Sequence, residues 1–285
     1  MMGRAHSLSG AGLWLAGSAT YTLVTGEELH PTIVVMGTAL VAGAALAPDL
    51  DSYTATVTRS FGLFGRFLYH MTNFISLLIY RITKTERDAD LENGHRTFTH
   101  TAVSALLAGG GVWAATTQIP GKTELMGKLY ENTEIASLVL MAFFLHLGLA
   151  GLFSKQIKKA KGIVGPYVLM AVSLVLTVIT AFFLPTGDDG LNGYFFPFAV
   201  TAGLLIHILG DLITLKGVPF VWPLKILGKR WYDVALPGPF RIKAGGAFEL
   251  SILTPIFVLL IAGGLVLHLL LGLDVVSPMV VNPTV

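Results

Sequence analysis

Long apolar segments recur along this chain and leave few ways to fold it. A transmembrane helix needs about 20 consecutive, predominantly apolar residues, and several segments approach or reach that length. The 285-residue chain is 53% hydrophobic and only 13% charged, with a mean hydropathy of +0.71, which is far from the composition of a soluble domain. We therefore predict an all-α, polytopic transmembrane helical bundle that forms one membrane-embedded domain over residues 1–285. Its seven predicted spans are residues 8–25, 32–48, 97–119, 135–153, 163–184, 194–215 and 250–272.

Residues 61–82 form a further apolar segment, which we predict to be an interfacial or re-entrant helix that does not cross. Arg66 and His70 are four residues apart and share one helical face, as in interfacial helices. If the segment does not cross and the N-terminus is cytoplasmic, 17 of the 19 Lys and Arg residues face the cytoplasm, including those of a solvated loop at 81–96. Cytoplasmic loops are expected to be enriched in Lys and Arg in this way. If the segment crossed, the basic cluster at 155–161 would face outward.

The residue types present limit the chemistry. The chain has no Cys, which excludes disulfides, thiolate metal sites and thiol nucleophiles. Any metal must be held by His, Asp and Glu, a set that suits borderline or hard divalent cations. The net charge of +2 is too small to indicate a nucleic-acid partner, so we attribute the basic residues to membrane topology.

Two histidines stand at the mouth of the apolar segment 97–119. His95 and His100 are five residues apart, so on a regular helix their side chains would lie about 140° apart. Both can converge on one point only if His95 lies in the loop and His100 in the first helical turns. Thr97 or Thr99 is then the expected N-cap. Imidazoles act as proton shuttles or metal ligands, so this segment is a candidate site.

Other ionisable residues fall at the same predicted side of the membrane. His207 and Asp211 are four residues apart and lie on one helical stripe, a spacing that suits two ligands of one cation or a ligand with its orienting carboxylate. Ionisable residues inside spans are costly and commonly functional. The set that clusters at this side is His6, Asp49, Asp51, His95, His100, His207 and Asp211.

Each group also has a structural explanation when taken alone. Asp49 could be a solvated helix end after Pro48, and His6 could be an ordinary interfacial residue. The pair of His207 and Asp211 could be a hydrogen-bonded couple that joins two helices. These explanations must hold at four places at once, so we favour one shared site. His30, His146 and His268 share no motif, and we expect them to be packing or helix-contact residues.

The motifs that carry these residues resemble the successive signatures of the YdjM-like family. The resemblance covers residues 1–110 and 195–255, and it stops over 123–186, where two additional spans are predicted at about 135–184. Thr101 stands where the family commonly has Ser, and Ser52 stands where some relatives have His. The matching stretches are His6, LAPDLD at 46–51, GHRTFTHT at 94–101, HILGDLIT at 207–214, GVPFVWP at 217–223 and GGAFE at 245–249.

Members of that family are described as LexA-regulated proteins of the bacterial inner membrane and as metal-dependent hydrolases. The resemblance therefore implies a multi-pass inner-membrane protein, here with a cytoplasmic N-terminus, that binds a divalent metal: Zn²⁺ first, with Mn²⁺ or Mg²⁺ as alternatives. It implies that Glu249 joins the seven residues above as a metal ligand. We assign the catalytic roles to Asp51, His100 and Asp211.

Metal-assisted hydrolysis of a phosphoester is the chemistry that such a set supports. A site at the membrane surface, near Trp222 and Trp231 as an interfacial belt, favours a lipid or lipid-linked substrate. Positive side chains nearby could meet phosphate oxygens, although they also fit plain inner-loop charges. They are Arg96, Lys225, Lys229, Arg230, Arg241 and Lys243.

Two other classes of protein remain open. An ion-coupled transporter or channel would use the same buried His and Asp residues, but it predicts polar residues spread through the membrane depth rather than gathered at one end. A non-catalytic structural membrane protein would bind no metal and would tolerate His100→Ala with a modest loss of stability. The partner common to all three is the lipid bilayer, and the sequence does not indicate an oligomeric state.

Overall fold

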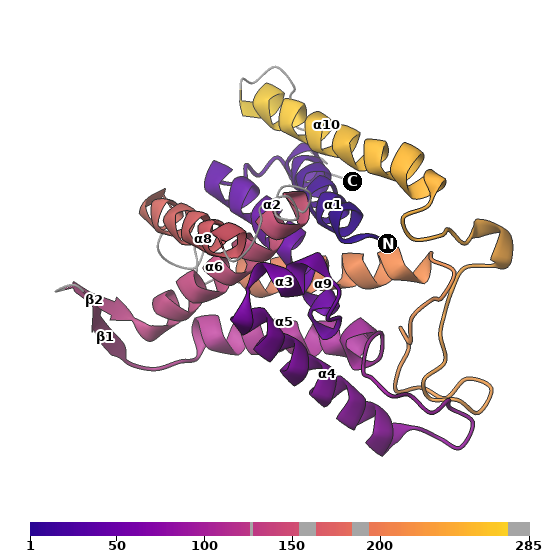
Figure 1. Cartoon of the computed structure of the whole chain (residues 1–285). Helices are drawn as coiled ribbons and strands as arrows, with labels where there is room; N and C mark the ends of the chain where they lie inside the picture. Colours follow the sequence, from indigo (N-terminus) through magenta and orange to yellow (C-terminus); the bar gives the residue numbers. More distant parts are fainter. Residues whose placement is uncertain (126–127, 154–163, 184–193, 273–285) are drawn as a thin grey trace, which may run out of the picture.

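The computed structural model describes residues 1–125, 128–153, 164–183 and 194–272, and the fold is a bundle of helices (Figure 1). The basic cluster at 155–161 lies outside these residues. One antiparallel hairpin, β1 (Lys122–Leu125) and β2 (Lys128–Glu131), pairs Lys122 with Glu131. The helices are α1 (Gly3–Thr25), α2 (Pro31–Ala44), α3 (Thr56–Ser60), α4 (Leu63–Thr83), α5 (Ala102–Thr117), α6 (Asn132–Leu152), α8 (Val164–Phe183), α9 (Phe195–Leu212) and α10 (Thr254–Gly272), with short helical turns η1 (Ala47–Asp51), η2 (Phe98–His100), η3 (Gly238–Phe240) and η4 (Glu249–Leu253).

The membrane bundle predicted from the sequence is confirmed, but the count of seven spans is not. α1 is 23 residues long, but Arg4, His6 and its many Gly, Ser and Thr residues make it less apolar. α5 and the apolar part of α8, Gly165–Thr180, are shorter than a span. Within the described ranges, four helical segments are long and apolar enough to cross a membrane: Pro31–Asp51, Asn132–Leu152, Phe195–Leu212 and Glu249–Gly272.

α2 lies at the centre of the bundle and packs against α1, α6 and α9. Its small residues let the neighbouring backbones approach closely, as the sequence predicts. A Cβ atom on Gly43 would lie only 1.8 Å from the carbonyl oxygen of Phe144 in α6, and one on Gly203 of α9 would lie 2.6 Å from the Cβ of Ala44. These close approaches hold α2 directly against the backbones of α6 and α9.

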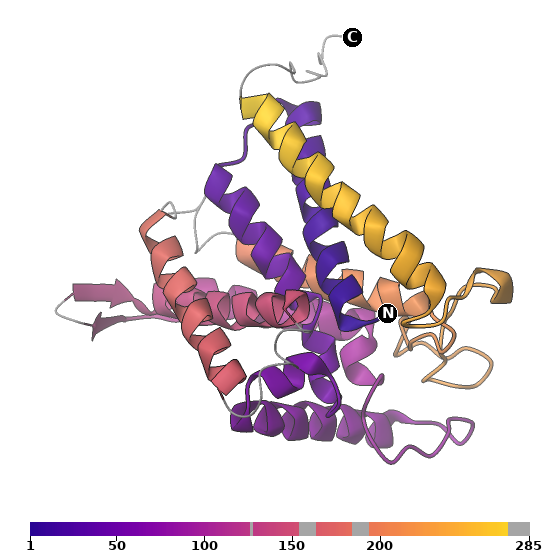
Figure 2. The ribbon, with the colours of Figure 1, turned by 45° about the horizontal axis from the view of Figure 1, so that its top comes forward.

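α4 lies on the opposite side of the molecule from α10 (Figures 1 and 2). It is one unbroken helix of 21 residues, in which only Gly65, Ser76 and Tyr80 are buried. Its exposed apolar side chains recur at helical spacing, which is the pattern of an interfacial helix and favours that form over a re-entrant one. They are Leu63, Phe64, Phe67, Met71, Phe74, Ile75, Leu78 and Ile82.

The loop after α4 is anchored by Asp88 to the long segment that follows α9. The Asp88 carboxylate accepts hydrogen bonds from the backbone nitrogen and hydroxyl of Thr85 at 2.7 and 2.9 Å, and from the backbone nitrogens of Arg230 and Trp231 at 3.2 and 3.1 Å. Trp231 is 7% exposed and stacks on Trp222. The predicted interfacial belt is therefore wrong for Trp231, because its indole packs inside this loop and donates to the Thr83 hydroxyl.

We expect Asp88→Asn to lower the free energy of unfolding by about 1 kcal/mol, which is the usual net contribution of a hydrogen bond. Burial disfavours its charge, but the bonds from Thr85, Trp231 and Arg230 more than offset this and lower the pKa of Asp88. A group whose pKa is lower in the folded chain stabilises it above the unfolded pKa, which is about 4 for Asp, and loses that effect as pH falls through the folded pKa.

Thermal unfolding in detergent, measured from pH 7 down to pH 3, checks this prediction. The acid-induced loss of stability should be steeper in the wild type than in Asp88→Asn. Asp90→Asn is the control for the neutral-pH stability, since the Asp90 side chain is 91% exposed. Equal stability of the Asp88 and Asp90 variants would contradict the anchoring role.

Candidate metal centre

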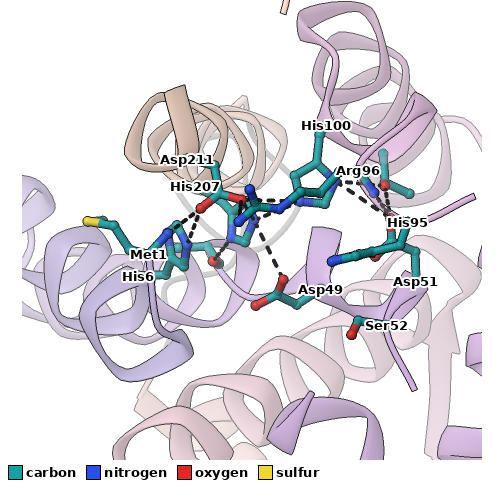
Figure 3. Close-up of polar contacts among 12 residues, drawn as sticks. Met1, His6, Asp49, Asp51, Ser52, His95, Arg96, His100, His207 and Asp211 are labelled. Atoms are coloured by element: carbon teal, nitrogen blue, oxygen red, sulfur yellow. Dashed lines mark hydrogen bonds and ion pairs between the residues drawn. The ribbon is translucent and has the colours of Figure 1, made fainter. Parts of the chain in front are cut away.

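The ends of three helices and one loop meet at a buried cluster of imidazoles and carboxylates (Figure 3). α1 contributes His6, the turn η1 after α2 contributes Asp49, η2 contributes His100, and α9 contributes His207 and Asp211. Their potential ligand atoms form two groups, and within each group all lie within 4.8 Å of one another. The groups are His6, His207 and Asp211, and Asp49, His100 and His207. Five of the eight predicted ligands therefore converge, and His207 belongs to both groups.

His6 lies against both α9 residues. Its Nε2 is 3.2 Å from Asp211 Oδ1, and its ring stacks on that of His207 with 3.8 Å between centroids. A Cβ atom on Gly210 would lie 3.1 Å from His6 Cε1, so a glycine leaves room for the imidazole. The buried Nδ1 of His6 has no hydrogen-bond partner among the described residues. A buried nitrogen of this kind is costly and suits a metal ligand.

The proton of His207 can be placed from its surroundings. α2 ends at Ala44, so the carbonyl of Ala45 is one of the unpaired acceptors at a helix end. His207 Nδ1 lies 2.8 Å from this oxygen and must donate to it. A neutral His207 therefore keeps its lone pair on Nε2, which lies 3.2 Å from His100 Nε2 and 3.9 Å from both Asp49 Oδ1 and Asp211 Oδ2.

The proton of His100 can be placed in the same way. The Thr99 hydroxyl donates its one proton to Asp51 Oδ2 at 2.5 Å, so toward His100 Nδ1, at 3.0 Å, it can only accept. A neutral His100 therefore also carries its lone pair on Nε2. Two ring nitrogens that face each other at 3.2 Å with lone pairs repel, unless a proton or a cation lies between them. The neutral cluster thus has the electrostatics of a cation site.

Asp51 is fully buried and organises the loop rather than joining either group. Its carboxylate accepts from His95 Nδ1 at 2.7 Å, from the backbone nitrogen of Arg96 at 3.2 Å and from Thr99. Carboxylates behind a ligating imidazole fix its orientation and tautomer. Asp51 acts on His100 in this way through Thr99.

The cluster reaches solvent on the side of His95 and Arg96. The His95 side chain is 37% exposed; burial disfavours its charge, but the hydrogen bond to Asp51 more than offsets this and raises the pKa of His95. Arg96 has a left-handed backbone with φ of 58° and places Nη2 2.8 Å from Asp211 Oδ2. A strained backbone in a non-glycine residue commonly marks a functional position.

Glu249, the eighth predicted ligand, lies outside both groups that the described residues form. It is fully buried at the start of η4, a π-helical turn, and accepts from the backbone nitrogens of Met2 at 2.7 Å and Gly245 at 2.9 Å. It therefore ties the start of α1 to the start of the last helix. The amino group of Met1 pairs with Asp211, a contact that we did not predict.

The start of α5 differs from the prediction. Thr101, rather than Thr97 or Thr99, is the N-cap, and its hydroxyl accepts from the backbone nitrogen of Ser104 at 3.0 Å. His100 lies in the short turn η2 before the helix and not in the first helical turns. The three-residue turn lets His95 and His100 approach one another without sharing a helical face, with 5.8 Å between ring centroids.

The three histidines that share no motif, His30, His146 and His268, lie apart from the cluster, as predicted. His146 contacts the hydroxyls of Ser60 and Ser173 at 3.0 and 3.3 Å, and His268 contacts Ser18 at 2.9 Å. The first two contacts join α6 to α3 and α8, and the third joins α10 to α1. His30 is the N-cap of α2 and accepts from the backbone nitrogen of Thr32.

Apolar helices that gather buried His and Asp side chains at one end define an integral membrane protein with a candidate metal centre. Residues 1–155, more than half of the chain, match the family model of the YdjM inner membrane protein. The chain therefore belongs to the YdjM family of inner membrane proteins. The match includes His6, Asp49 and His100 but ends before His207 and Asp211. Neither a curated protein nor a solved structure matches the chain.

Proposed function

We propose that the protein is a membrane-bound, metal-dependent hydrolase of a phosphoester, with its site at the cytoplasmic face of the inner membrane. One observation carries the proposal. The Nε2 atoms of His100 and His207 face each other at 3.2 Å, while both Nδ1 atoms are committed to protein acceptors. With Asp49 and Asp211 beside them, these nitrogens form a donor set that suits Zn²⁺, with Mn²⁺ or Mg²⁺ as alternatives.

The donor set would hold the cation through His6, His207 and Asp211 in one group and Asp49, His100 and His207 in the other. When bound, such a cation polarises a phosphoryl oxygen and makes water acidic enough to attack at neutral pH. Asp51 keeps His100 in the required tautomer through Thr99, so its part is positioning.

The partly exposed residues indicate how a substrate would be oriented. His95, Asp49 and Arg96 lie on the open side of the cluster. The Arg96 guanidinium can meet phosphate oxygens in pairs, which supports an anionic phosphoester over a neutral ester. The basic residues Lys225, Lys229 and Lys243 are exposed in the segment that follows α9, and they favour an anionic surface at this side. A lipid or lipid-linked phosphoester fits both features.

The metal content of the purified protein tests the proposal first. We expect about one or more Zn or Mn per chain in the wild type by inductively coupled plasma mass spectrometry, and a loss of most of it in His100→Ala. His268→Ala is the matched control, because His268 lies outside both ligand groups. Cleavage of a synthetic phosphodiester should fall at least a hundredfold in His100→Ala and stay within about twofold of wild type in the control.

A wild-type protein that stays metal-free after reconstitution with these ions would overturn the hydrolase proposal. A metal-loaded protein that cleaves no phosphoester would overturn its catalytic part.

A further inference from the structure

The three helices that carry the candidate metal centre also enclose an apolar cavity further along their length. The cavity has a volume of about 480 Å³, within the usual range of about 300–1,000 Å³ for ligand sites. Its walls are almost entirely apolar. Residues from α1, α2 and α9 line it, among them Leu13, Trp14, Gly17, Val41, Phe198 and Ile206.

The cavity begins close to the metal centre in sequence and in space. Ile206 is the neighbour of His207, and Val41 lies four residues before Ala45, whose carbonyl accepts from His207. From Ile206 to Phe195 at the start of α9 the lining covers eleven residue steps, or about 16 Å of helix. The cavity therefore extends from the site toward the other end of the bundle.

One side of the cavity is open. The side chains of Leu13 and Phe198 are 46% and 64% exposed, and Gly17, four residues after Leu13 on α1, is also exposed. α9 and the continuous segment of α2 and η1, Pro31–Asp51, are long and apolar enough to cross a membrane, so we expect this opening to face hydrocarbon rather than water. A chain from the bilayer can enter sideways without leaving an apolar medium.

We propose that this cavity holds the acyl chain of a phospholipid-type substrate whose phosphate group reaches the metal centre. The inference rests on the proposed phosphoester hydrolase and names its substrate class: a membrane amphiphile that carries a phosphate and one accessible linear acyl chain. The two parts of the substrate then meet the two chemically matched regions of α1, α2 and α9. The polar ends of these helices bind the phosphate, and their apolar middle parts bind the chain.

Gly17 allows the cavity to be filled without disturbing the bundle. A Cβ atom there would meet nothing within 4 Å, so Gly17→Phe places a ring at the mouth of the cavity. Gly263 on α10 is the matched control, because it is also exposed and a Cβ atom there would also meet nothing within 4 Å. Gly263→Phe adds the same ring to a helix that lines no part of this cavity.

The test uses Zn²⁺-loaded protein in bilayer nanodiscs and a dodecyl phosphate with a photoreactive diazirine near the end of its chain. After irradiation, peptide mapping should place the label on lining residues of α1, α2 and α9. Gly17→Phe should reduce this labelling at least tenfold, and Gly263→Phe should leave it unchanged. The corresponding dodecanol probe should label the same residues at least tenfold less, since it lacks the phosphate.

Labelling spread evenly over lipid-exposed helices, or labelling that Gly17→Phe does not reduce, would overturn the proposal. Equal labelling by the phosphate and alcohol probes would overturn the link to the metal centre. Photolabelling requires no turnover, so failure of the hydrolase proposal is recognised separately, by the metal content and phosphodiester assays. A Gly17→Phe protein that retains its metal is folded, and its labelling result stands.

Discussion

Asp211→Asn should reduce metal affinity by about a hundredfold or more, because even residues behind the ligands commonly contribute 10–100-fold. The Asp211 carboxylate is 1% exposed and lies 3.2 Å from His6 Nε2 and 2.8 Å from Arg96 Nη2. Asparagine has nearly the same shape, so the helix can stay intact while the negative charge is lost. The nearby Arg96 guanidinium then lacks its partner, which also costs stability.

Competition with a chromogenic chelator, and calorimetric titration with Zn²⁺, measure this change. Phosphodiester cleavage should fall together with affinity at limiting metal. Asp90→Asn makes the same chemical change on an exposed carboxylate paired with Lys84, and it should bind Zn²⁺ like the wild type. An Asp211→Asn protein that keeps wild-type affinity would remove Asp211 from the metal centre.

Gly43→Ala should destabilise the bundle by about 3 kcal/mol or more. The new Cβ would lie 1.8 Å from the carbonyl oxygen of Phe144 and 2.6 Å from its carbonyl carbon. Both contacts are with backbone, so α6 itself must move away from α2. That movement opens the packing next to Ala45, which holds His207 in place.

Thermal unfolding in detergent, followed by circular dichroism, measures the loss. Gly110→Ala is the control in α5, where an added Cβ would meet nothing within 4 Å. In an exposed helix, Ala in place of Gly is favourable by about 1 kcal/mol, so the control should be as stable as the wild type or slightly more stable. A Gly43→Ala protein with the wild-type melting temperature would contradict the close packing of α2 on α6.

The convergence of the site residues could be predicted because the relevant signals are properties of the sequence. Apolar segments locate the helices, and the predicted topology brings the ends with His6, Asp49, His100, His207 and Asp211 to one side. The spacing of four residues between His207 and Asp211 places both on one stripe. These signals do not depend on how the side chains pack. The two ligand groups contain the residues that the signals indicate.

Other features had no sequence signal. The acceptor that fixes the His207 tautomer is a backbone carbonyl, which every residue possesses, and only the end of α2 makes that of Ala45 free. Asp51 and Glu249 carry the same carboxyl group as Asp49, yet their bonds to the loop and to backbone nitrogens separate them from the ligand groups. Thr97, Thr99 and Thr101 are chemically alike, so the true N-cap depends on the tertiary position of the turn before it.

The number of spans could not be fixed for a related reason. Segments such as α1 and α5 bury polar and small residues against neighbouring helices, so their hydropathy reflects contact with protein as much as contact with lipid.

The contact between His6 and Asp211 joins residues that are 205 positions apart, and this separation orders the assembly of the protein in time. During synthesis α1 emerges long before α9, so His6 must wait for its carboxylate partner until nearly three quarters of the chain has been made. A ligand that binds only the native arrangement stabilises it by mass action. In the proposed metalloprotein neither ligand group is complete before α9 has been made, so the cation would bind only after α9 has joined α1 and α2.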